Sequence, residues 1–162
     1  MSEINRPKPT GLYFEEFALL SPTDIIHGKK THRITEQENL AFALMTENMQ
    51  PIHIDEAYAK TTKYGQRIVN GILTQGVLVG LSVEGLTEGT IFANLKYTDV
   101  IASAPVFIGD RLSVQTSIIS TSVTSHPETG LVVMEHHGFK QDGTEIMSLQ
   151  RTAIIYRRPQ EF

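Results

Sequence analysis

The element from which we derive the fold is the segment Asn70-Gly71-Ile72-Leu73-Thr74-Gln75-Gly76-Val77-Leu78-Val79-Gly80-Leu81. Asparagine is a preferred N-cap, so we expect a helix that begins at Gly71 and ends near Gly85. Apolar or small side chains lie on nearly all sides of it, which is typical of a buried helix. Gly76 and Gly80 lower the helix propensity. We interpret them as positions that a sheet or a second subunit approaches closely.

The chain after this helix has the pattern of an antiparallel sheet. Four strands are predicted, at residues 90–97, 111–124, 131–141 and 145–156. Asp142-Gly143 is a hairpin signal between the last two, and Ile118-Ile119 indicates a bulge in the second. The fold class is therefore α+β, with one long helix against an antiparallel sheet.

The chain before the helix contains shorter elements. Residues 1–10 are interpreted as an arm, 12–17 as a short strand or turn, and 31–34 as a short strand. Residues 35–45 begin with the capping-box pattern of Thr35 and Glu38 and continue with apolar residues at helical spacing. These are Leu40, Ala41, Ala43 and Leu44. We expect one domain over residues 1–162, without repeats or linkers.

Composition excludes several classes of protein. The net charge is −4 and there is no basic tract, which argues against nucleic acid as a partner. The absence of cysteine excludes disulfides, thiolate nucleophiles and cysteine metal sites. The N-terminus lacks the apolar core of a signal peptide. The longest apolar segment, 72–83, is too short and too polar to span a bilayer. We expect a cytoplasmic protein.

A candidate catalytic loop precedes the helix: Asn48-Met49-Gln50-Pro51-Ile52-His53. Pro51 fixes its own φ and restricts Gln50, so the loop is stiff and holds His53 in one direction. Histidine transfers protons near neutral pH. Asp55 is a good N-cap for a helix over Glu56–Lys60. The alternative is that Asn48 and Gln50 satisfy loop backbone and that His53 is a cap or packing residue.

Gly71 supplies the second half of a possible site. The start of a helix offers free N–H groups to a developing oxyanion, so this pair of features suits chemistry on a carbonyl. The alternative is that Gly71 only permits close packing. Lys60, Lys63 and Arg67 near the loop either meet phosphates or form a solvated face. The adjacent His136 and His137 point to opposite faces of a strand, so we predict no metal site.

The sequence resembles the MaoC-like, R-specific enoyl-CoA hydratases over residues 30–157. The resemblance rests on the Asn48–His53 loop and on three later segments: Tyr64-Gly65-Gln66-Arg67, Val69-Asn70-Gly71 and Ala104-Pro105-Val106-Phe107-Ile108-Gly109-Asp110-Arg111-Leu112. It implies a hotdog fold, in which an antiparallel sheet wraps around a long central helix.

The family loop reads Gly-Asp-x-Asn-Pro-aliphatic-His, and this sequence departs from it. Pro51, Ile52 and His53 match. Glu47 replaces the glycine, Asn48 the aspartate and Gln50 the asparagine. In the family, the aspartate and histidine together activate a water molecule. Asn48 can orient a water or the imidazole but cannot accept a proton. The asparagine form also resembles mesaconyl-CoA hydratases, which are longer chains with two hotdog units.

The resemblance implies a hydro-lyase that adds water reversibly to a 2-enoyl-CoA, without metal or redox cofactor. His53 and Asn48 are the expected catalytic residues. Substrate contacts are expected from Gly71, Asn70, Ile72, Gln50 and Arg67. Acyl-CoA is the expected substrate, and a homodimer or dimer of dimers the expected assembly. Two alternatives remain: a hotdog thioesterase that uses Glu47, and a non-catalytic acyl-CoA binder.

Overall fold

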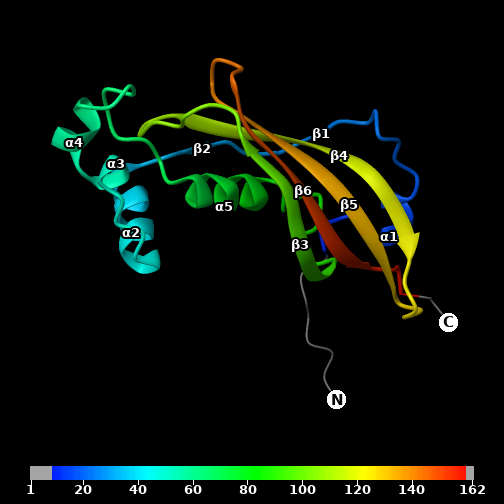
Figure 1. Cartoon of the computed structure of the whole chain (residues 1–162). Helices are drawn as coiled ribbons and strands as arrows, with labels where there is room; N and C mark the ends of the chain where they lie inside the picture. The colour runs from blue at the N-terminus through cyan, green and yellow to red at the C-terminus, as the bar shows by residue number, and fades with distance from the viewer. Residues whose placement is uncertain (1–8, 160–162) are drawn as a thin grey trace.

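An antiparallel sheet forms the body of the computed structural model, which describes residues 9–159 (Figure 1). Its strand order is β1-β4-β5-β6-β3, and β2 also pairs with β4. The bounds are β1 Ile26–His27, β2 His32–Arg33, β3 Ile91–Ala102, β4 Arg111–Val123, β5 Thr129–Phe139 and β6 Glu145–Tyr156. The register between β4 and β5 shifts at Ile118/Ser120, which confirms the predicted bulge.

The helix α5, Gly71–Leu81, lies against the concave face of this sheet (Figure 1). A side chain on Gly138 of β5 would collide with Leu78, so the glycine allows helix and sheet to approach. The prediction of burial on nearly all sides is wrong within this chain. Only Thr74 and Leu78 are buried, and a Cβ on Gly76 or Gly80 would meet no atom within 4 Å. The face that carries these glycines has no neighbour among the described residues.

Three short helices gather beside the N-terminal end of α5 (Figure 1). They are α2 Glu36–Thr46, α3 Pro51–Ile54 and α4 Glu56–Lys60. The capping box of Thr35 and Glu38 is confirmed. The buried residues of α2 are Asn39 and Ala43, whereas Leu40 and Leu44 are 42% and 57% exposed. The helix therefore turns a polar side chain inward.

Several helices and strands have bounds that differ from those predicted from the sequence. The segment expected as a short strand or turn contains the helical turn α1, Phe14–Phe17. The helix α5 ends at Leu81, before Gly85, and β3 continues to Ala102. Most of the predicted arm, residues 1–8, lies outside the described part of the chain. No described helix combines the length and apolar character needed to cross a membrane.

Candidate active site

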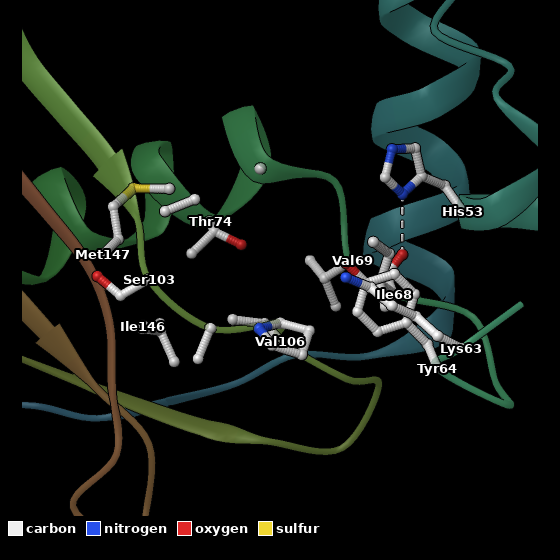
Figure 2. A pocket seen from close by; sticks show the side chains of 14 residues that line it. His53, Lys63, Tyr64, Ile68, Val69, Thr74, Ser103, Val106, Ile146 and Met147 are labelled. Atoms are coloured by element: carbon white, nitrogen blue, oxygen red, sulfur yellow. Dashed lines mark hydrogen bonds between the residues drawn. The ribbon is translucent and has the colours of Figure 1, made fainter.

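A cavity of about 430 Å³ lies where α3, the start of α5 and the sheet come together. Figure 2 shows His53, Lys63 and Tyr64 at one end of it and Ser103, Ile146 and Met147 at the other. The other residues that line it are Ile68, Val69, Gly71, Thr74, Ala102, Ala104, Pro105 and Val106. Among residues 9–159 the lining contains no carboxylate, and most of it is apolar.

His53 lies in the helical turn α3 rather than in the loop that we expected. Pro51 occupies the first position of this turn, where its missing N–H is not needed. The His53 ring contacts the backbone carbonyl of Ile68, with 2.9 Å from Nδ1 to oxygen (Figure 2). Because a carbonyl oxygen only accepts, Nδ1 carries the proton of the neutral ring. The lone pair is then on Nε2, where it can act as a base.

Gly71 is the first residue of α5, and its neighbour Asn70 forms the N-cap. The Asn70 side-chain oxygen accepts a hydrogen bond from the Ile72 N–H at 2.9 Å. Among the described residues the Gly71 N–H has no partner, and Gly71 lines the cavity. A base and a free helix-terminal N–H therefore share one cavity.

The structure does not bring all the predicted site residues to this cavity. Asn48 is half-buried in the connection between α2 and α3, and it does not line the cavity. Gln50 is exposed as the N-cap of α3. Asn70 is buried as a cap, and Ile72 is 62% exposed on the open side of α5.

Arg67 is held away from the cavity by two carboxylates. Its guanidinium lies 2.7 Å from Glu36 and 3.1 Å from Glu56, so it joins α2 to α4. Lys60 pairs more loosely with Glu56, at 3.9 Å. Lys63 is the cation that reaches the cavity, with its ammonium 5.1 Å from the centre of the Tyr64 ring. Arg67 and Lys63 therefore differ in their tertiary contacts, and these contacts could not be predicted from the spacing of the residues in the sequence.

Sequence reasoning missed most of the apolar lining. Ala102 at the end of β3 and the next residues, Ser103, Ala104 and Pro105, close one wall. Met147 of β6 lies opposite Ala102 in the sheet register. The proline of Ala104-Pro105-Val106 supported the family resemblance without being assigned to the site. The predicted strand ended at residue 97, eight positions before this proline, so no local pattern pointed to the cavity.

The chain is similar in sequence to one known protein family and to two characterised relatives. A family model described as a MaoC like domain matches residues 21–136. The chain is 31% identical over 87 residues to the (R)-specific enoyl-CoA hydratase of Aeromonas caviae, which covers 53% of this chain and 63% of the relative. It is 30% identical over 154 residues to the mesaconyl-CoA hydratase of Haloarcula marismortui, which covers 91% of this chain and 41% of the relative.

Solved structures show the same fold. The MaoC-like dehydratase from Rhodospirillum rubrum superposes with a TM-score of 0.79 at 24% identity, covering 93% of this chain and all of that one. A Mycobacterium tuberculosis protein with a double hotdog fold gives a TM-score of 0.81 at 18% identity. This chain covers 46% of that protein, in keeping with one hotdog unit of the two. The hotdog fold is confirmed.

Proposed function

The chain belongs to the MaoC-like domain family, and we propose that it adds water reversibly to the double bond of a 2-enoyl-CoA thioester. The observation that supports this most is the cavity shared by His53 and Gly71. One supplies a base and the other a hydrogen-bond donor for a thioester oxygen. The two relatives described above are both named as hydratases, which points to the same chemistry. The chain spans 63% of the length of the first and 41% of the length of the second.

The proposed reaction needs one base and one oxyanion donor. Nε2 of His53 takes a proton from water as the water oxygen bonds to C3 of the enoyl group. The electron pair of the double bond moves toward the thioester oxygen, which accepts a hydrogen bond from the Gly71 N–H. The dipole of α5 stabilises this charge. The imidazolium then returns the proton to C2, so the net change is addition of one water.

Asn48 has a supporting role in this proposal. A carboxamide does not take a proton near neutral pH, so both proton transfers fall to His53. Asn48 acts by orienting water or the imidazole. The apolar end of the cavity, with Val106, Ile146 and Met147, receives the acyl chain. Lys63 at the opposite end is the cation best placed to meet the CoA phosphates.

The thioesterase alternative has less support. It calls for a carboxylate beside the thioester, and Glu47 is exposed and does not line the cavity. An acyl-CoA binder without catalysis is the second alternative, and Asn48 is the feature that favours it. Incubation with crotonyl-CoA separates the three functions. Loss of enoyl absorbance without thiol release supports hydration, free thiol indicates hydrolysis, and binding without either change indicates a binder.

We propose also that the active form is a homodimer. The strand β3 is an edge of the sheet, and Phe92, Leu95 and Ile101 on it are 54–59% exposed. A long apolar edge strand is a pairing surface unless something covers it. The open face of α5, with Gly76 and Gly80, is the second uncovered surface. Because β3 ends at Ala102 in the cavity wall, a partner on β3 lies beside the acyl site.

A further inference from the structure

Asn39 is a buried polar residue of α2 that connects the two halves of the site. Its side chain is 1% exposed. The Nδ2 group donates to the backbone carbonyl of His53 at 2.9 Å, and the Oδ1 atom accepts from the backbone N–H of Asn70 at 3.0 Å. His53 carries the base, and Asn70 directly precedes the oxyanion donor Gly71. One carboxamide therefore bridges two segments that are 17 positions apart in sequence.

The two partners of Asn39 determine its chemistry. A carbonyl must receive a hydrogen and an N–H must give one, so the bridging group needs a donor and an acceptor side by side. A carboxamide offers both on one planar group at every pH near neutrality. Asparagine is also a poor residue for a helix interior, and at a buried helical position an apolar residue is the usual choice. This position therefore keeps a residue that α2 alone does not favour.

The remaining contacts at this point show why the bridge matters. The Asn70 carbonyl accepts from the Thr74 N–H at 3.0 Å, so Asn70 is tied into the first turn of α5. His53 is tied at its ring to Ile68. With Asn39 in place, the backbone of the base and the backbone of the oxyanion donor are fixed to one rigid helix.

We propose that Asn39 is a positioning residue that sets the distance between the His53 imidazole and the Gly71 N–H. This inference rests on the proposed hydratase function. It assigns to α2 a role in the chemistry although no residue of α2 lines the cavity among those described.

Replacement of Asn39 by leucine tests the bridge. Small displacements of aligned groups cost about 10²-fold in rate, so kcat for crotonyl-CoA should fall by about that factor while KM changes little. The matched control is Thr116→Val, which removes a buried hydrogen bond of 2.8 Å to His136, since neither residue lines the cavity. It should lose stability but keep kcat. If Asn39→Leu kept kcat within twofold of wild type, the positioning role would be overturned.

Asn39→Asp gives a second readout, which does not depend on how well the leucine variant folds. A protonated carboxyl can donate to the His53 carbonyl and accept from the Asn70 N–H, whereas the ionised form places a negative charge against the carbonyl. Burial favours the protonated form. Activity of the variant should therefore rise with pH as in the wild type and then fall as the carboxyl ionises, giving a bell-shaped profile in place of a rising one. A profile like that of the wild type contradicts the proposal.

The two proposals fail in different ways. If the wild type hydrates no enoyl-CoA, the proposed function fails, and the bridge is then judged by NMR on Asn39→Asp at high pH. The Gly71 amide signal and the His53 ring signals should both shift, and the Asn70 amide should exchange faster with solvent. If the changes were confined to α2, the bridge would be refuted independently of activity.

Discussion

At the scale of single residues, Glu47 occupies a backbone conformation that favours glycine. Its φ is 56°, in the left-handed region, and it forms the C-cap of α2. The Glu47 N–H bonds to the carbonyl of Leu44, which ends the helix. Left-handed conformations cost non-glycine residues roughly 1–2 kcal/mol. The end of α2 therefore holds a non-glycine residue in a conformation that does not suit it.

We predict that Glu47→Gly stabilises the protein. The relief of backbone strain is partly offset by the greater freedom of glycine in the unfolded chain, which leaves a gain of about 0.5–1 kcal/mol. Urea unfolding measures it. The control is Met45→Gly, at a 75% exposed position two residues earlier in α2. This change should cost about 1 kcal/mol because the backbone there is helical. Destabilisation by Glu47→Gly would contradict the strain assignment.

The Gly71 N–H is tested by two substitutions at one position. Gly71→Pro deletes the N–H but suits a first helical turn, and Asn70 before it already has φ −60° and ψ 130°, which proline accepts in its predecessor. Loss of one oxyanion donor costs about 3–4 kcal/mol, so kcat should fall by 10²–10³-fold. Gly71→Ala keeps the N–H, and its methyl group meets no atom within 4 Å. It should retain most activity, and equal losses in the two variants would contradict the assignment.

At the scale of elements, the sequence predicted regular structure well where capping and alternation were strong. The capping box of α2, the Asp55 cap of α4 and the strand β6 are confirmed. The burial of α5 could not be predicted, because its apolar positions do not say whether the sheet or another molecule covers them. Local sequence likewise does not contain the ion pairs that hold Arg67 away from the cavity. His53 and Gly71 were predictable because each lies in a local motif, whereas Asn39 acts only through contacts between segments.

The central strands contain a histidine that makes the fold sensitive to acid. Burial, reinforced by the nearby Arg151 guanidinium, lowers the pKa of His136 on β5 to about 3. The unfolded histidine binds a proton below its ordinary pKa of 6.5, whereas the folded one does not until the pH approaches 3. The stability that the neutral His136 contributes is therefore fully present above pH 6.5 and is lost as the pH falls toward 3. Between pH 6 and 4 we expect the free energy of unfolding of His136→Asn to fall less steeply than that of wild type, by about 1.4 kcal/mol per pH unit.

His137 on the same strand provides the control of opposite sign. Burial tends to lower its pKa, but the carboxylates of Glu145 and Glu135 outweigh this and raise it. Its contribution to stability is present at low pH and is lost as pH rises through the raised value. His137→Asn should therefore destabilise the protein at pH 6 more than at pH 9. Urea unfolding of both variants across the pH range checks the pair, and slopes that match wild type in His136→Asn would contradict the account.

At the scale of the whole molecule, the uncovered β3 edge and α5 face predict assembly. Leu95→Lys with Ile101→Lys places charge on the edge strand and should convert a dimer into an 18 kDa monomer, the mass of one chain. Activity should fall together with the loss of the dimer, because the cavity wall continues from β3. Light scattering measures the mass, and Val123→Lys, at a 72% exposed position at the end of β4, is the control. A wild type that is monomeric at micromolar concentration would contradict the prediction.

The central claim is that His53 alone transfers protons, while the Gly71 N–H stabilises the negative charge that develops on the thioester oxygen. The most direct measurement is the pH dependence of kcat/KM for crotonyl-CoA in wild type, His53→Ala and Asn48→Asp. We predict that wild-type activity rises through one ionisation and that His53→Ala loses about 10²–10⁴-fold or more. In Asn48→Asp the rise should move to higher pH, because a carboxylate stabilises the imidazolium. Substantial turnover by His53→Ala, or turnover that only Asn48→Asp possesses, would contradict this account, and the latter result would identify the wild type as an acyl-CoA binder.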